Sequence, residues 1–232
     1  MTQLFMPGSF RLDRMRNASV QVFDHLRERI ISLDLKPGAQ LQRDELAAYF
    51  DLSSTPVRDA LTRLGEEGLV DIVPKQSTAV RAIDVDSARQ AHFLRLSLEL
   101  EIVHILAHAP DRQLVTSLEN IVSQQALALS HRDFATFAQA DQTFHRQMFA
   151  AAQAETLWHW MRRQSGQLDR LRRLHLPIKE QAANILADHA GIVAAIADGD
   201  PGQAQRNIRA HLSGMFTQLD AIRAEHPDWL LP

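Results

Sequence analysis

Residues 51–64 read DLSSTPVRDALTRL, and this stretch decides the fold of the first part of the chain. Its beginning is typical of a helix N-terminus, because Thr55 can cap the helix, Pro56 suits the first helical position and Asp59 favours the first turn. Apolar side chains then recur at i, i+4 and i+7, as Val57, Leu61 and Leu64. The stretch therefore predicts the turn and second helix of a helix-turn-helix with one buried face.

Another face of this helix carries Ser54, Arg58 and Thr62, which are free to enter a groove of DNA. The flanking sequence predicts two further helices and two strands, at 20–33, 44–50, 69–73 and 78–81. Lys36-Pro37-Gly38 ends the first helix, and Gly68 ends the 56–67 helix as a left-handed cap. Three helices and a hairpin make a winged helix-turn-helix, which we place at residues 18–84 behind a flexible arm of residues 1–17.

From residue 86 the pattern changes to long amphipathic helices with short breaks at Pro110, Ser130, Pro177 and the turn Gly199-Asp200-Pro201. We expect six helices, at 87–108, 112–130, 132–152, 155–176, 179–198 and 202–226. The fold class is therefore mainly α, with an all-α bundle over 85–226 and a tail of residues 227–232.

Composition narrows the class of protein further. The 232 residues include no cysteine, which excludes disulfides and sulfur-ligated metals and is compatible with a reducing cytoplasm. No apolar run approaches the ~20 residues of a membrane span, and the N-terminus lacks a signal-peptide core, so we expect a cytoplasmic protein without membrane contact. The net charge is −3, so a positive surface for DNA has to arise from the placement of charges.

Titratable residues on apolar helical stripes are the candidates for a metal site. Asp141 and His145 are spaced i, i+4, which puts both on one side of a helix. His189 and His211 each lie 11 positions from Asp200, so in an antiparallel hairpin they share one level, roughly 16 Å from the turn. Three imidazoles and a carboxylate suit a divalent transition metal such as Zn²⁺ or Ni²⁺. The alternative for each residue is an ordinary hydrogen-bonded side chain in the core.

Arginines near this group have two interpretations. A guanidinium at Arg95 suits a carboxylate ligand, but an i, i+4 ion pair with Glu99 on a solvated face is the reading that the residues alone favour. A basic cluster on a later helix is expected to form a solvated or interdomain face; it comprises Arg162, Arg163, Arg170, Arg172 and Arg173.

At these residues the chain resembles the GntR family of bacterial transcription regulators, in the FadR-like subgroup with a helical FCD-type effector domain. The N-terminal part of the resemblance rests on Lys36-Pro37-Gly38, Glu45-Leu46-Ala47, Thr55 to Leu61 and Glu67 to Val70. The C-terminal part rests on Arg95 and Glu99, Asp141 with Phe144-His145-Arg146, His189, Gly199-Asp200 and His211-Leu212.

The resemblance implies that the metal ligands are Asp141, His145, His189 and His211, and that Arg95 contacts the effector. It also implies a small organic acid as effector, a homodimer, and a palindromic double-stranded operator. The chain departs from the family at Ser54 and Asp44, where many relatives carry arginines that commonly touch DNA. Gln153-Ala154 also replaces the usual Gly-Asn after the helix that carries Asp141.

These observations predict a transcriptional repressor, not an enzyme, whose operator affinity is controlled by an organic acid at the metal. We expect DNA contacts from seven residues, namely Arg43, Ser54, Thr55, Arg58, Arg63, Lys75 and Gln76. Two alternatives stay open: a metalloenzyme that uses the same four ligands on a small carboxylate, and a metal sensor without an organic effector.

Overall fold

The computed structural model describes residues 10–74, 76–175, 181–216 and 219–231, except for the side chains of residues 175 and 215. The chain folds into two compact units. The first unit contains residues 1–85 together with 223–232, and the second contains residues 86–222. Each unit has a hydrophobic core of its own.

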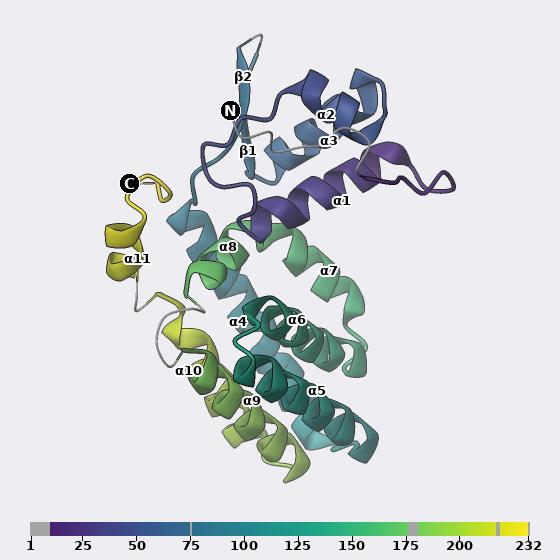
Figure 1. The fold of residues 1–232 in the computed structure, drawn as a ribbon. Helices are drawn as coiled ribbons and strands as arrows, with labels where there is room; N and C mark the ends of the chain where they lie inside the picture. The colour runs from purple at the N-terminus through teal and green to yellow at the C-terminus, as the bar shows by residue number, and fades with distance from the viewer. Residues whose placement is uncertain (1–9, 75, 176–180, 217–218, 232) are drawn as a thin grey trace. The chain divides into compact units, whose positions relative to one another are not determined.

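The first unit contains three helices and a two-stranded antiparallel hairpin (Figure 1), which confirms the winged helix-turn-helix. Its elements are α1 (Ala18–Ile31), α2 (Arg43–Phe50), α3 (Ser54–Glu66), β1 (Val70–Val73) and β2 (Ser77–Val80). In the hairpin Val70 pairs with Val80 and Val73 with Ser77. The inward stripe of α3 is buried as expected, since Val57 and Leu64 are 0% exposed.

Only the C-terminal end of α3 agrees with the prediction from the sequence. The helix begins at Ser54 after Ser53, whose side chain makes no capping hydrogen bond, so the expected cap at Thr55 is wrong by two residues. At the other end Gly68 has φ +67°, and the Leu69 N–H donates to the Leu64 carbonyl at 2.9 Å. This left-handed turn satisfies the last carbonyls of α3 and leads the chain into β1.

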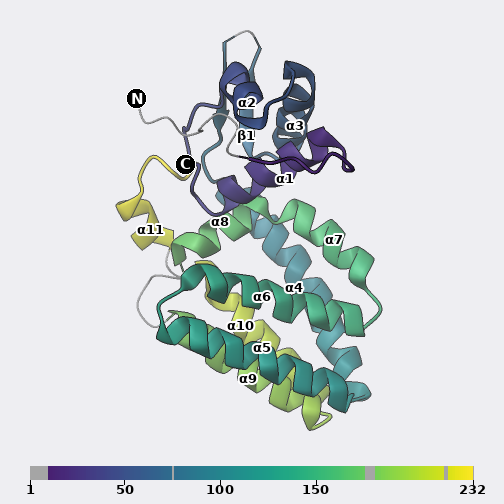
Figure 2. The same ribbon diagram turned by 45° about the vertical axis from the view of Figure 1, so that its right-hand side comes forward.

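The second unit is a helical bundle. Its helices are α4 (Val85–His108), α5 (Arg112–Ser130), α6 (Phe134–Ala151), α7 (Glu155–Gln164), α8 (Gly166–His175), α9 (Gln181–Ala197), α10 (Pro201–Ser213) and the 3₁₀ turn η1 (Gly214–Phe216). Helix α11 (Leu219–Glu225) ends the series. Figure 2 shows α5, α6 and α9 side by side, with α10 against α9. Leu118, Phe144, Ile192 and Ile208 lie between them, each 0% exposed.

Two of the six expected helices are interrupted. The helix expected at 155–176 divides into α7 and α8, because Ser165 turns its hydroxyl to Asp169 Oδ2 at 2.9 Å and Gly166 is a weak helix former. The helix expected at 202–226 divides into α10, η1 and α11. The break expected at Pro177 lies outside the described residues.

The described parts of the expected arm and tail make contacts within the first unit. In the described part of the arm, the Asp13 N–H donates to Gln21 Oε1 at 2.8 Å, and the ring of Phe10 lies 4.4 Å from that of His25. Beyond α11, the Ile83 N–H donates to the Trp229 carbonyl at 2.7 Å. Both segments therefore pack within the first unit. No helix in the described ranges is long and apolar enough to cross a membrane.

Candidate metal centre and DNA-binding surface

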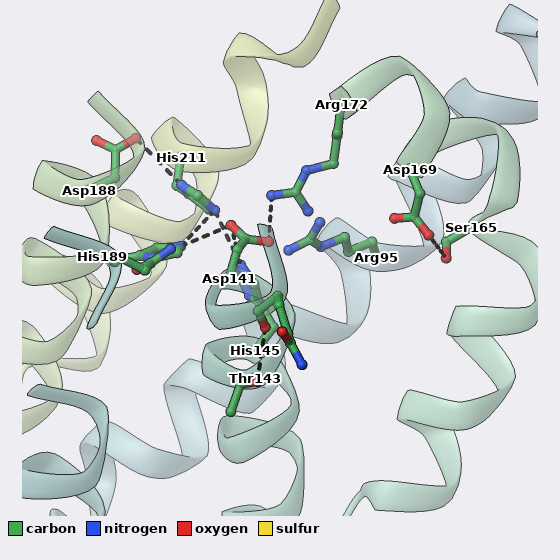
Figure 3. A network of polar contacts seen from close by, with 12 residues as sticks. Arg95, Asp141, Thr143, His145, Ser165, Asp169, Arg172, Asp188, His189 and His211 are labelled. Atoms are coloured by element: carbon green, nitrogen blue, oxygen red, sulfur yellow. Dashed lines mark hydrogen bonds and ion pairs between the residues drawn. The ribbon is translucent and has the colours of Figure 1, made fainter. Parts of the chain in front are cut away.

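The four residues expected at the metal site meet in the core of the second unit. Asp141 and His145 come from α6, His189 from α9 and His211 from α10, and one ligand atom of each lies within 4.8 Å of the others. The Nε2 atom of His211 is 3.3 Å from the Nε2 atoms of both His145 and His189 (Figure 3). Asp141 Oδ1 lies 3.7 Å from His189 Nε2 and 3.9 Å from His145 Nε2. All four side chains are buried.

Oxygen atoms on the outer side of the rings orient the three imidazoles. Gln125 Oε1 is 2.7 Å from His189 Nδ1. Glu99 Oε2 is 2.8 Å from His145 Nδ1 and Asp188 Oδ2 is 3.5 Å from His211 Nδ1, close contacts that are not aligned as hydrogen bonds. Because these oxygens can only accept, they favour a proton on each Nδ1, which leaves the Nε2 lone pairs directed at one point.

The electrostatics at the place where the three Nε2 lone pairs converge favour a bound cation. Burial lowers the pKa of His145 to about 4 and holds the pKa of His189 well below its usual value, so both rings are neutral at pH 7. Asp141 Oδ1 is buried and has no hydrogen-bond partner among the described residues. Converging lone pairs and an unsatisfied carboxylate oxygen repel one another unless something positive lies between them.

The spacing of the nitrogens also fits a transition metal. Two bonds of about 2.0–2.1 Å at a tetrahedral angle separate their nitrogen atoms by about 3.3 Å. The two Nε2···Nε2 distances through His211 are both 3.3 Å. An Asp and three His are the oxygen and nitrogen donors that Zn²⁺ and Ni²⁺ accept, so these residues fit a divalent transition metal.

Two charged residues from other helices support this group. Arg172 Nη2 on α8 donates to Asp141 Oδ2 at 2.7 Å. Burial acts to raise the pKa of Asp141, but Arg172 and the neighbouring histidines outweigh it and hold this pKa well below its ordinary value. Burial also acts to raise the pKa of Glu99, but Arg95 and His145 lower it to about 2. Both carboxylates are therefore ionised at neutral pH.

A cavity of about 310 Å³ opens beside His211. Its polar wall is formed by His92, Arg95, Arg172, Asn184, Asp188 and His211. The expected ion pair between Arg95 and Glu99 is present at 2.6 Å, but its placement on a solvated face is wrong, because Arg95 is only 5% exposed. The solvated or interdomain face expected for Arg172 is wrong for the same reason, since its side chain is 13% exposed and faces the cavity.

The sequence reading missed Glu99, Gln125 and Arg172 as parts of this site. Gln125 carried a usable signal, because it is a polar residue on the otherwise apolar buried stripe of α5, at 0% exposure. Asp141 was found by the same kind of signal on α6. For Arg172 the sequence carried no such signal, because it stands among Arg170 and Arg173, and such a run of arginines is typical of a solvated face.

The first unit carries a groove of about 840 Å³ between the start of α2, the outward face of α3 and the hairpin. Four of the residues expected to contact DNA line it, namely Arg43, Ser54, Arg58 and Gln76. Gln40, Gln42, Thr62 and Thr78 also line it. Thr55 does not line it, and the Arg63 guanidinium lies instead 4.1 Å over the ring of Phe23. Lys75 lies outside the described residues.

A winged helix-turn-helix joined to a separate helical unit defines a class of DNA-binding transcriptional regulators. Comparison with known families agrees on both units. Residues 18–80 match bacterial regulatory proteins of the gntR family, and residues 90–214 match the FCD domain. The chain belongs to the GntR family of transcriptional regulators with an FCD domain, and it is not an enzyme.

Two relatives and one solved structure are similar to this chain over most of their length. An uncharacterized HTH-type transcriptional regulator in an unstable DNA locus of Streptomyces ambofaciens is 34% identical over 208 residues, covering 89% of this chain and 87% of the relative. The transcriptional repressor RspR of Escherichia coli is 25% identical, covering 94% and 96%. The solved structure of E. coli McbR/YncC has a TM-score of 0.74 at 19% identity and covers 91% of this chain and 100% of its own, which shows a shared fold.

Proposed function

We propose that this regulator is a metal-dependent repressor whose operator affinity is controlled by a small organic acid. Asp141, His145, His189 and His211 would hold a divalent transition metal, with Zn²⁺ or Ni²⁺ favoured by the donor set. The observation that carries the proposal is the convergence of three Nε2 lone pairs and a carboxylate oxygen beside a cavity that also contains arginine.

The bound metal supplies a positive centre to which an acid oxygen can bind. Arg95, buried and paired with Glu99 through its Nε, presents its remaining N–H groups to the acid. Because the four ligands belong to α6, α9 and α10, an acid held here acts on the packing of three helices at once. Small helix shifts can then change the separation of two reading heads, whose half-sites are spaced by about 34 Å on DNA.

On DNA, Arg58 would reach base edges or phosphate in the major groove, and Ser54 and Thr55 would bind phosphate. Arg43 and Gln76 lie along the same groove as Arg58, at the start of α2 and in the hairpin. Lys75 remains a proposed contact with the flanking groove and Arg63 a proposed DNA contact, on the charge of their side chains alone.

We further propose that the protein is a homodimer, as a palindromic operator requires. An apolar surface on α4 and α7 supports this proposal, because Leu94, Leu98, Leu157 and Trp160 surround a hollow of about 380 Å³. Trp160 is 62% exposed. Large exposed apolar patches mark interaction surfaces. Trp160→Glu should produce a monomer in sedimentation velocity, whereas Leu127→Glu, at an equally exposed leucine of α5, should leave the dimer intact.

DNA reading can be tested without a known operator. The wild-type protein is used to select binding sequences from a random duplex pool, and the recovered sequence becomes the gel-shift probe. Arg58→Ala should abolish specific binding while the dimer stays folded. Arg209→Ala, which removes an equal charge from an exposed site on α10, should bind like the wild type. Wild-type affinity in the Arg58 variant would contradict the assignment.

The role of the acid is tested on metal-loaded and chelated protein. Small carboxylates should raise the melting temperature only when metal is present, and the same acids should release the selected DNA. If metal alone changes DNA affinity and no acid shifts the melting temperature, the protein is a metal sensor and the organic-acid proposal fails. His189→Ala should lose both the metal and the acid response.

A further inference from the structure

Two arginines from different helices converge on the cavity beside the candidate metal centre. Arg95 comes from α4 and Arg172 from α8, and Figure 3 shows both guanidinium groups directed toward the neighbourhood of Asp141. The side chains are 6% and 13% exposed. Burial lowers the pKa of Arg172, and the charge of Arg95 adds to this effect, so the two cations lie close enough to repel each other.

Each guanidinium has donors to spare. A guanidinium offers five N–H groups. In the described residues, Arg95 donates through Nε to Glu99, and Arg172 donates through Nη2 to Asp141. The other nitrogen atoms of both residues have no hydrogen bond to the described part of the chain. The two buried cations share one cavity and have unused donors. An anion between them would accept these hydrogen bonds and stabilise both charges.

The balance of buried charges indicates how many negative groups the effector must supply. Arg95 and Arg172 are compensated by Glu99 and Asp141, as their ion pairs show. Asp169, whose charge also acts on both guanidiniums, is balanced by Arg162 at 2.7 Å. A divalent ion on the four ligands then leaves an excess of two positive charges in the buried part of the site. Asp188, at the cavity wall, is 37% exposed and largely screened by water. A monocarboxylate would leave one buried positive charge uncompensated, which is costly.

We infer that Arg95 and Arg172 form a carboxylate subsite separate from the metal, so that the effector is a dicarboxylate. One carboxylate binds at the metal, and the other lies between the two guanidiniums. The carboxyl group of Asp141 shows how short this span is, because Oδ1 faces the ring nitrogens while Oδ2 accepts from Arg172. The cavity of about 310 Å³ is at the small end of the ~300–1,000 Å³ typical of ligand sites, which fits a short carbon chain.

The inference rests on the proposed function and is tested by calorimetric titration of the metal-loaded full chain. The probes are matched pairs of equal chain length: malonate with propionate, succinate with butyrate, and glutarate with pentanoate. In at least one pair the dicarboxylate should bind tenfold or more tightly than its partner. Equal affinity within every pair would overturn the inference and leave the proposed acid response standing. Binding by none of the six acids would contradict both.

Two variants distinguish a second carboxylate subsite from a role of Arg172 that only positions Asp141. Arg172→Lys keeps a positive charge beside Asp141 but removes the planar fork. It should weaken the preferred dicarboxylate at least tenfold, leave its monocarboxylate partner within twofold, and retain metal. Equal weakening of both acids would show that Arg172 only positions Asp141, which overturns the inference. Arg95 has no hydrogen bond to the four ligands, so Arg95→Lys should weaken the dicarboxylate in the same selective way. Arg173→Lys is the control and should leave the affinities for both acids unchanged.

Discussion

Replacing Glu99 by glutamine tests whether a buried carboxylate sets the metal affinity of this site. Glu99 is 0% exposed and lies between the Arg95 Nε at 2.6 Å and the His145 Nδ1 at 2.8 Å. Its pKa of about 2 means that it is fully ionised at neutral pH. Both neighbours therefore face a negative charge that glutamine of the same size does not carry.

The expected magnitude follows from what the amide can replace. Its single oxygen can accept from Arg95 or from His145, but its NH₂ group then faces the other donor. If the NH₂ group faces His145, the Nδ1 atom is driven to lose its proton, and the proton moves to the Nε2 atom that would bind the metal. Loss of such an outer partner of a ligating histidine costs 10–100-fold in metal affinity, or about 1.4–2.8 kcal/mol.

The assay is a competition for Zn²⁺ between the purified protein and a chromophoric chelator at neutral pH. Glu101→Gln is the matched control, because Glu101 is exposed on the same helix. Circular dichroism of both variants establishes that they are folded. Affinity of the Glu99 variant within twofold of the wild type would refute the argument that this carboxylate orients His145.

Three further predictions concern stability and are measured by denaturant unfolding. Leu118→Ala, at 0% exposure, should cost about 2–5 kcal/mol, and Leu127→Ala, at 62% exposure, should cost little; similar losses would contradict the assigned core. Gly199→Ala should cost about 1–3 kcal/mol because Gly199 has φ +68°, whereas Gly214→Ala, with φ −69° and open space, should be neutral; no loss at Gly199 would exclude strain there. Burial acts to raise the pKa of Asp169, but its ion pair with an arginine outweighs this and lowers the pKa below 3.8. Asp169→Asn should therefore cost about 3 kcal/mol at pH 7, and this difference should shrink as the pH falls below 3.8, where the wild-type carboxylate also becomes protonated; a constant difference would contradict the shift.

Local patterns were sufficient for the first unit and for the four candidate ligands. The i, i+4 spacing of Asp141 and His145 needs only an α-helix, and the equal distances of His189 and His211 from Asp200 need only a hairpin. The 3.3 Å between the Nε2 atoms of His189 and His211 agrees with that expectation.

The surroundings of the ligands depend on tertiary packing that no local pattern encodes. Arg172 reaches Asp141 across 31 positions of sequence, after a break at Ser165 that turns α8 away from α7. A run of arginines usually marks a solvated face, so the sequence alone placed Arg172 there. Glu99 was expected to pair with Arg95, but only the packing of α4 against α6 shows that it also meets His145.

The segment beyond Ile222 completes the first unit. The chain leaves that unit after Val85 and re-enters it at Arg223, within α11, where Ile83 holds the returning segment through hydrogen bonds to Trp229 and Leu231. The first unit is therefore assembled from two separate stretches of chain. A truncation before Arg223 would remove a structural part of that unit rather than a free end.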